Sequence, residues 1–143
     1  MPAFAKFLLG VAAVLLMTWL SHGPLGNGAA LADGLELQAR AAVAGTGVPG
    51  VTVGLDRNPI SRRATLAGTA DPFQREGQGS LKGLNDVVGE IDGISAVGWA
   101  DTPNGARSLP LLVETMLLAV AAYLAGLAIS WLLFGRPKRD SYL

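Results

Sequence analysis

A long apolar run near the C-terminus limits what this chain can fold into more than any other feature. Leu111 to Phe134 gives 24 consecutive residues with a single charge, Glu114, close to the start of the run. A helix of about 20 apolar residues spans the hydrocarbon core of a bilayer, where backbone polar groups must bond within the segment. We therefore predict a transmembrane helix over residues 109–134.

The residues that follow this run set its orientation. Arg136, Lys138 and Arg139 lie directly after it, and basic residues beside a span favour the cytoplasmic side. We predict that residues 135–143 form a basic cytoplasmic tail. Trp131 lies near that end, where an indole ring favours the membrane–water boundary.

A second apolar segment opens the chain. Lys6 is followed by an unbroken apolar run from Phe7 to Leu20. The segment has two interpretations, a retained anchor over residues 1–22 and a secretory signal cut after Ala32. We favour the anchor, because the cut would lie twelve residues beyond the run and because Trp19 would sit at the far interface.

Either interpretation carries the following segment across the membrane. Lys6 also places the N-terminus in the cytoplasm if the segment is retained. His22 would then lie just outside the outer boundary, and we expect an interfacial role for it. Glu114 would lie near the same boundary, where we expect a solvated carboxylate, although ionisable groups inside membranes are often functional.

Composition excludes several classes of function. Net charge is zero, which gives no support to a nucleic-acid partner. The absence of cysteine excludes disulfides, thiolate metal sites and cysteine nucleophiles, and one histidine cannot build a multi-histidine site. We expect neither a cofactor nor a metal.

The region between the apolar runs has the periodicities of a small mixed domain. The pattern predicts a linker at Asn27–Asp33, a helix at Leu35–Ala44, strands at Val51–Leu55 and Arg62–Leu66, a helix at Asp71–Ile91 and a strand at Ile94–Trp99. Glycines weaken the second of these helices near residues 77–79, and a break there is one possibility.

Two short motifs in this region resemble the BON domain, a module of bacterial envelope proteins. One is Ala64-Thr-Leu-Ala-Gly68, and the other runs from Ile91 through Gly93-Ile94 to Val97. The resemblance implies an α+β fold of the αββαβ type over residues 33–102, an envelope location, and binding or structural work without catalytic residues. We expect Gly68 and Gly93 to serve as structural turns, Gly93 at the end of a helix.

The chain offers little for catalysis. Asp86, Glu90 and Asp92 lie close together on one predicted helix, and we interpret them as a solvated face rather than a metal cluster. The serines of the middle region and the membrane-proximal His22 make no plausible triad. We predict that the protein is not an enzyme.

Small residues recur every four positions in the C-terminal span, at Ala122, Gly126 and Ser130. Such a stripe lets another helix approach closely, although an alanine-rich helix produces one by chance. The packing partner would be the N-terminal helix or a helix of another protein.

These patterns lead to one functional hypothesis and one alternative. The hypothesis is a two-pass protein of the bacterial inner membrane, with both termini cytoplasmic and the middle domain periplasmic. It would be a structural accessory subunit of a respiratory or photosynthetic complex, in contact with membrane lipids and other inner-membrane subunits. The alternative is an independent envelope-binding module that recognises phospholipid or a periplasmic partner protein.

Overall fold

The protein is a small α+β domain attached to two long apolar helices. A computed structural model describes residues 2–102 and 108–135. In chain order the elements are α1 (Ala3–His22), α2 (Asn27–Gly45), β1 (Thr52–Arg57), β2 (Ile60–Ala67), α3 (Pro72–Glu76), β3 (Gly77–Gln78), β4 (Leu81–Lys82), α4 (Leu84–Gly89), β5 (Ala96–Trp99) and α5 (Leu111–Phe134).

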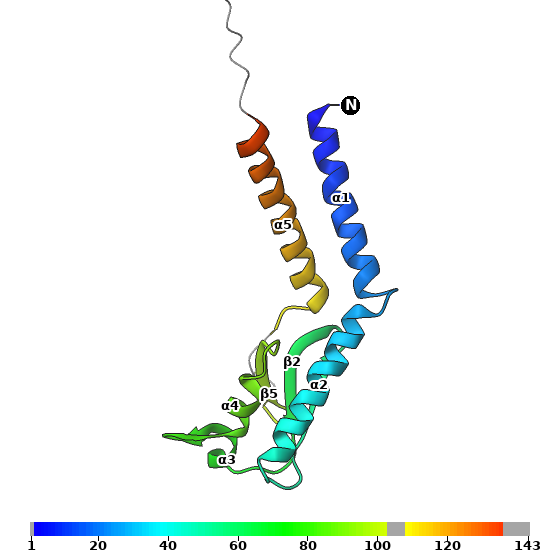
Figure 1. Ribbon diagram of the computed structural model, residues 1–143. Helices are drawn as coiled ribbons and strands as arrows, with labels where there is room; N and C mark the ends of the chain where they lie inside the picture. Colours follow the sequence, from blue (N-terminus) through cyan, green and yellow to red (C-terminus); the bar gives the residue numbers. More distant parts are fainter. Residues whose placement is uncertain (1, 103–107, 136–143) are drawn as a thin grey trace, which may run out of the picture.

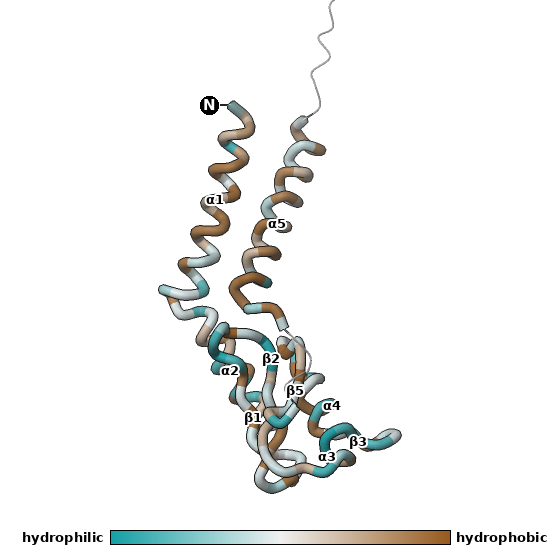
Figure 2. Tube along the Cα trace, turned by 180° about the vertical axis from the view of Figure 1, so that it is seen from behind, coloured by the Kyte–Doolittle hydropathy of each residue, from teal (hydrophilic) through white to brown (hydrophobic). Residues whose placement is uncertain are grey.

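Helices α1 and α5 lie side by side and extend away from the domain (Figure 1). Figure 2 shows that both are hydrophobic along most of their length. Each is long and apolar enough to cross a membrane, as a two-pass membrane protein requires. The expected C-terminal span agrees with α5, which starts at Leu111, two residues inside the predicted range.

The domain is built on a three-stranded sheet of order β1-β2-β5. β1 and β2 form an antiparallel hairpin, with Val53 opposite Leu66, and β5 pairs in parallel with β2. Helix α2 packs against β1 and β2, and α4 packs against α2 and β5. The core includes Ala32, Leu35, Ala39, Val43, Val53, Leu55, Ala64, Leu66, Leu84, Val88 and Trp99.

The other face of the sheet is polar. Side chains alternate between the two faces of a strand, so Arg63 and Thr65 lie on the face of the sheet opposite to that of the buried Ala64 and Leu66. Thr65 donates a hydrogen bond of 3.1 Å to Asp56. The guanidinium of Arg63 lies over Gly98, where a Cβ would come within 2.6 Å of Nη2.

The predicted linker at Asn27–Asp33 is wrong, because these residues form the first turns of α2. Gly26 adopts a left-handed conformation, with φ of 74°, that ends the turn after α1 and allows a new helix to begin at once. Gly28 and Ala32 are buried on the same helical face as Leu35. Small residues that suggest flexibility here allow close packing instead.

The predicted helix at Asp71–Ile91 is divided into α3 and α4 by a short hairpin, β3–β4. Asp71 caps α3, since its side chain accepts the backbone N–H of Gln74. Gly77 and Gly79 then have positive φ values of 74° and 62°, which a continuous helix cannot contain. The break lies where the glycines weaken the pattern.

The remaining boundaries differ by a few residues from the prediction. The hairpin strands extend to Arg57 and from Ile60, and the last strand begins at Ala96 instead of Ile94. Ile94 and Val97 are partly buried and pack against the core. The helix–strand–strand–helix–strand order is observed, with the β3–β4 hairpin inserted.

The close approach of Gly68 to the backbone of Gly50 can be tested by substitution. Its φ is +129°, and a Cβ there would lie 2.2 Å from the carbonyl oxygen of Gly50. We expect Gly68→Ala to lower the stability of the full chain by about 2 kcal/mol or more. Thermal unfolding in detergent micelles, followed by tryptophan fluorescence, measures the loss.

Gly34→Ala is the matched control, because this α2 position has open space around its Cβ. We expect it to leave the melting temperature unchanged or to raise it. Equal melting temperatures for the two variants would contradict the close approach of Gly68 and Gly50.

Candidate functional site: the junction of the domain with the apolar helices

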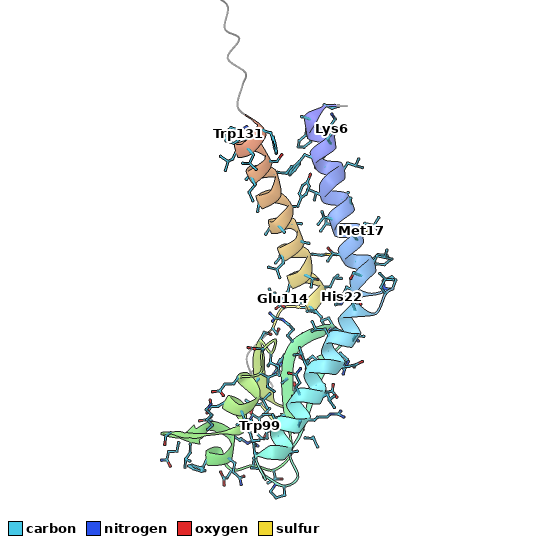
Figure 3. The ribbon with its side chains drawn as sticks, in the orientation of Figure 1. Lys6, Met17, His22, Trp99, Glu114 and Trp131 are labelled. Atoms are coloured by element: carbon cyan, nitrogen blue, oxygen red, sulfur yellow. The ribbon has the colours of Figure 1, made fainter. Side chains whose placement is uncertain are left out.

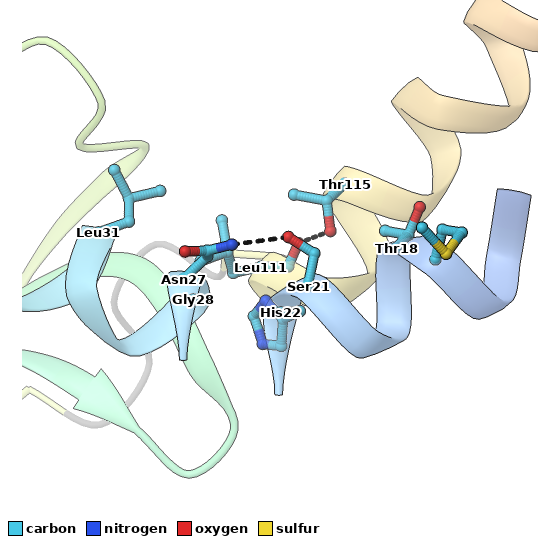
Figure 4. Close-up of a pocket in the computed structure, with 9 residues that line it drawn as sticks. Thr18, Ser21, His22, Asn27, Gly28, Leu31, Leu111 and Thr115 are labelled. Carbon is cyan, nitrogen blue, oxygen red and sulfur yellow. Dashed lines mark hydrogen bonds between the residues drawn. The ribbon is translucent and has the colours of Figure 1, made fainter. Parts of the chain in front are cut away.

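A cavity lies where the end of α1, the start of α2 and the start of α5 meet (Figure 4). Its volume is about 520 Å³. The lining combines apolar side chains with hydroxyl, amide and imidazole groups, from Met17, Thr18, Ser21, His22, Asn27, Gly28, Leu31, Leu111 and Thr115. The cavity lies at the domain end of both apolar helices.

His22 is held in the wall of this cavity by Gly28. A Cβ on Gly28 would lie 2.5 Å from the imidazole Cε1 and Nδ1 atoms, so the ring packs directly on the α2 backbone. Ser21 is engaged next to it, since its Oγ accepts a hydrogen bond of 2.9 Å from the amide of Asn27. No hydrogen bond in the described part of the chain joins His22 to a hydroxyl. The arrangement therefore lacks a nucleophile–base pair and fits a packing role.

An ion pair links α5 to the sheet. The Nε of Arg62 on β2 lies 2.6 Å from a carboxylate oxygen of Glu114 in the first turn of α5. Their side chains are 34% and 17% exposed, and Figure 3 shows Glu114 at the lower end of α5, facing the domain. Arg62 also donates a bond of 3.3 Å to the carbonyl of Gly93. One arginine therefore joins α5, β2 and the turn before β5.

Two further contacts connect the same elements. Ser61 on β2 forms an isolated antiparallel bridge with Pro110, and the Ser61 side chain is buried. The hydroxyls of Ser95 and Ser108 lie 2.6 Å apart. Helix α5 is therefore attached to the sheet immediately before its first turn.

The hairpin is fastened to α2 by charge. Arg57 on β1 contacts Asp33 at 2.6 Å and Glu36 at 2.5 Å, both on α2. The hydrogen bond from Arg57 holds the pKa of Glu36 below its ordinary value, opposed by partial burial of the carboxyl. The Glu36 bond in turn raises the pKa of Arg57. Arg40 forms a second ion pair with Glu36 from the next turn of α2.

Trp99 closes the opposite end of the domain. Its indole N–H donates a bond of 2.8 Å to Asn85, and the Cζ of Arg75 lies 4.0 Å from its ring centroid. Arg75 also donates two bonds to Asp101, at 3.0 and 2.7 Å, which lower the pKa of that carboxyl. A fully satisfied Trp99 of this kind closes a core and leaves no group free for chemistry.

The predicted helix-packing stripe is not covered by α1. Ala122, Gly126 and Ser130 are exposed, and a Cβ on Gly126 would meet nothing within 4 Å. Helix α1 contacts α5 through the Tyr123 ring, which lies 6.0 Å from that of Phe7. Helix α1 therefore leaves the stripe exposed, and a helix-packing role for these three residues remains a prediction.

The other predicted site residues are distributed over the molecule. Trp19 is 50% exposed near the domain end of α1, and Trp131 is 70% exposed near the far end of α5 (Figure 3). Gly68 and Gly93 have positive φ values of 129° and 102°. The three basic residues Arg136, Lys138 and Arg139 lie outside the described residues.

Two of the three acidic residues around α4 are used within the fold. Asp86 accepts the backbone N–H of Gly83 at the start of the helix, and Glu90 pairs with Lys82 at 2.6 Å. Within residues 2–102 and 108–135, no group of three or more histidine or acidic side chains is placed to hold a metal ion.

Comparison with known proteins gives no relative for this arrangement: no family model, curated protein or solved structure matches the chain. Function must therefore be argued from the geometry of the junction.

Sequence reasoning missed the pairing of Arg62 with Glu114. A lone acid in the first turn of a transmembrane segment signals that a basic partner is close, because such a charge is costly in lipid when unpaired. The sequence does not show which of several arginines is that partner. Arg62 precedes Glu114 by 52 positions, and only the fold brings the two together.

A double-mutant cycle tests this attachment. We expect Arg62→Gln and Glu114→Gln each to destabilise the full chain, with a coupling energy of about 1–3 kcal/mol because the pair is partly desolvated. Chemical or thermal unfolding in detergent micelles gives the four stabilities.

The pair Lys82–Glu90 is the control, with side chains 58% and 59% exposed. Its coupling should be about 0.5 kcal/mol or less. A coupling for Arg62 and Glu114 no larger than that of the control would contradict the role of this ion pair in attaching α5 to the sheet.

The lowered pKa of Glu36 predicts a pH dependence. The ordinary pKa is near 4.5, so the Arg57 contact stabilises the folded chain above that pH and the contribution is lost as pH falls through the folded-state value. We expect Glu36→Gln to lower stability by about 1 kcal/mol at neutral pH. The difference from the natural chain should shrink progressively below about pH 4.5.

Melting temperatures of both chains across this pH range measure the effect. Glu76→Gln is the control, because Glu76 is exposed and forms no ion pair in the described residues. A difference for Glu36→Gln that stays constant down to acid pH would contradict the assigned cause.

Proposed function

We propose that this protein is a non-enzymatic accessory subunit of a larger complex in the bacterial inner membrane, a respiratory or photosynthetic one. Its two apolar helices span the membrane with both termini in the cytoplasm, and its BON-like domain lies in the periplasm. The observation that carries the proposal is the clamp between β2 and α5, formed by Arg62, Glu114 and the Ser61–Pro110 bridge.

The clamp bears on function because it fixes the domain on the helix pair. The domain is also attached to α1, because only residues 23–26 separate α1 from α2, the first helix of the domain. A domain held at both junctions cannot reorient freely above the membrane. Such rigidity serves a protein that positions surfaces for neighbours, whereas a tethered capture module functions on a flexible linker.

Exposed helix surface supports the same proposal. The stripe of Ala122, Gly126 and Ser130 is free on α5 after α1 has packed. Small residues permit close backbone approach between helices. The surface therefore suits a transmembrane helix of another subunit.

The BON-like identity is part of the proposal. It is supported by the helix–strand–strand–helix–strand order and by the glycines that end β2 and precede β5, Gly68 and Gly93. The inserted β3–β4 hairpin departs from that order. Retention of the N-terminal helix is supported by Ala32, which is 1% exposed in the second turn of α2. A cut after Ala32 would remove part of the core.

Reporter fusions test the topology. We expect alkaline phosphatase inserted after Asp101 to be active and the same enzyme fused after the last residue to be inactive, because the phosphatase folds only outside the cytoplasm. Green fluorescent protein at the two positions should give the opposite pattern. Cytoplasmic behaviour of the Asp101 fusion would contradict the proposed orientation.

Purification of the tagged protein in mild detergent tests the accessory role. We expect other inner-membrane subunits to co-purify in fixed ratio and to be lost from the double variant Ala122→Leu/Gly126→Leu. The control is Ala121→Leu/Ala125→Leu, which adds two leucine side chains at exposed positions outside the stripe. Purification of the natural chain by itself would overturn the accessory role.

The cavity at the junction favours one alternative, an envelope module that recognises phospholipid. Its polar groups and apolar wall lie where both apolar helices meet the domain, the level at which lipid headgroups would surround it. We expect Thr115→Phe to remove lipid that stays bound in native mass spectrometry if this alternative holds. Equal lipid retention by both chains would exclude it.

A further inference from the structure

The cavity at the junction is lined by no lysine, arginine, aspartate or glutamate among the described residues. Part of its wall is apolar, from Met17, Leu31 and Leu111, and the rest carries hydroxyl, amide and imidazole groups. A phosphate buried here would lack a lysine or arginine partner, and a buried ion is costly unless it is paired. The cavity therefore suits an uncharged polar group that is attached to an apolar chain.

Two hydroxyl groups of the lining have already donated their hydrogens. Thr18 donates to the carbonyl of Val14 at 2.8 Å. Thr115 donates to the carbonyls of Leu111 and Leu112, at 2.9 and 3.0 Å. Each bond returns to the helix that carries the threonine, a common use of such hydroxyls within helices. Neither threonine is therefore free to donate a hydrogen bond to a ligand.

Ser21 and Asn27 are different, because each keeps a hydrogen. The amide nitrogen of Asn27 donates one of its two hydrogens to the Oγ of Ser21 at 2.9 Å (Figure 4). The second amide hydrogen and the hydroxyl hydrogen of Ser21 have no protein acceptor within residues 2–102 and 108–135. These two neighbouring donors, one at the end of α1 and one at the start of α2, match a ligand that accepts hydrogen bonds.

The position of the cavity determines which acceptor is close to it. In the proposed topology, α1 and α5 leave the hydrocarbon at this level, and the ester carbonyls of diacyl lipids lie between the hydrocarbon and the headgroups. Met17 and Leu31 border the cavity and are 64% and 46% exposed. Apolar surface is therefore available to an acyl chain next to the donors.

We infer that the junction cavity binds a membrane lipid through an uncharged carbonyl group, with the ester of a diacyl lipid as the expected source. The carbonyl accepts hydrogen bonds from Ser21 and Asn27, the acyl chain lies on Met17 and Leu31, and the phosphate stays outside in water. The ring of an isoprenoid quinone offers the same carbonyl chemistry. The inference deepens the lipid-recognition alternative above and rests on the proposed topology, which places the cavity at the membrane boundary.

Native mass spectrometry of the full chain in detergent micelles with added lipid tests this inference. We expect dioleoylglycerol and dioleoyl-phosphatidylglycerol to bind with apparent affinities within about threefold of each other, because the headgroup makes no contact. The ether-linked form of the same phosphatidylglycerol keeps the phosphate and lacks both carbonyls, so it should bind about tenfold more weakly or worse. Binding of a short-chain ubiquinone without binding of either ester lipid would support the carbonyl site with a quinone as its source.

Two variants separate the donors from the rest of the lining. Ser21→Ala should weaken binding of the ester lipids by about three- to tenfold and leave that of the ether lipid unchanged. Thr18→Val is the matched control in the same lining, because it removes a hydroxyl already bonded to its own helix. It should bind lipid as the natural chain does.

Three results would overturn the inference: equal binding of the ester and ether lipids, unaltered binding by Ser21→Ala, or binding that requires the phosphate. The last would assign the site to an ion pair with His22 and leave the phospholipid alternative standing. Absence of all lipid binding would overturn the inference and that alternative together. The accessory role and the topology are tested separately, by co-purification and by the reporter fusions.

Discussion

The ion pair between Arg62 and Glu114 is the interaction on which the arrangement of this molecule depends. It joins a strand of the domain to the first turn of an apolar helix, at a place where both side chains are partly shielded from water. A partly buried charge that loses its partner is strongly destabilising. The pair therefore constrains the orientation of the domain relative to α5 to one in which both charges keep their partner.

A small core makes this dependence understandable. The sheet has three strands and is covered by α2 and α4 on one face, while its other face is polar. Domains of this size bury a modest fraction of their surface and gain little stability to spare. Ion pairs from Arg57 to α2 and the Arg75 stack on Trp99 tie the periphery to this core. Attachment to two helices adds constraint that the core alone does not provide.

Much of the fold follows from the sequence because its patterns are local. The apolar run that forms α5, the alternation in the hairpin and the Asp71 cap can all be predicted from neighbouring residues. The helix at Asn27 could not, because Gly28 and Ala32 suggest a linker, and only the fold supplies the contacts that bury them, His22 for Gly28 and the core for Ala32. The β3–β4 hairpin could be predicted only as a weak point, since glycines show where a helix fails and not what replaces it.

The candidate site was harder to predict, because its contacts join segments that are far apart in the sequence. Glu114 can be noted from the sequence, but its partner is chosen by the fold, as is the contact of His22 with Gly28. Contacts between distant segments form the candidate site, and a pattern within one segment does not report them.

The β3–β4 hairpin projects sideways from the domain (Figure 1), with Leu81 63% exposed. Because Arg62, Glu114 and the Ser61–Pro110 bridge attach the domain to α5, this hairpin keeps a fixed direction relative to the α1–α5 pair. A neighbour seated against a chosen flank of the helices would always meet the hairpin at the same angle. The direction of the hairpin would therefore fix how a subunit bound there is oriented around the helix pair.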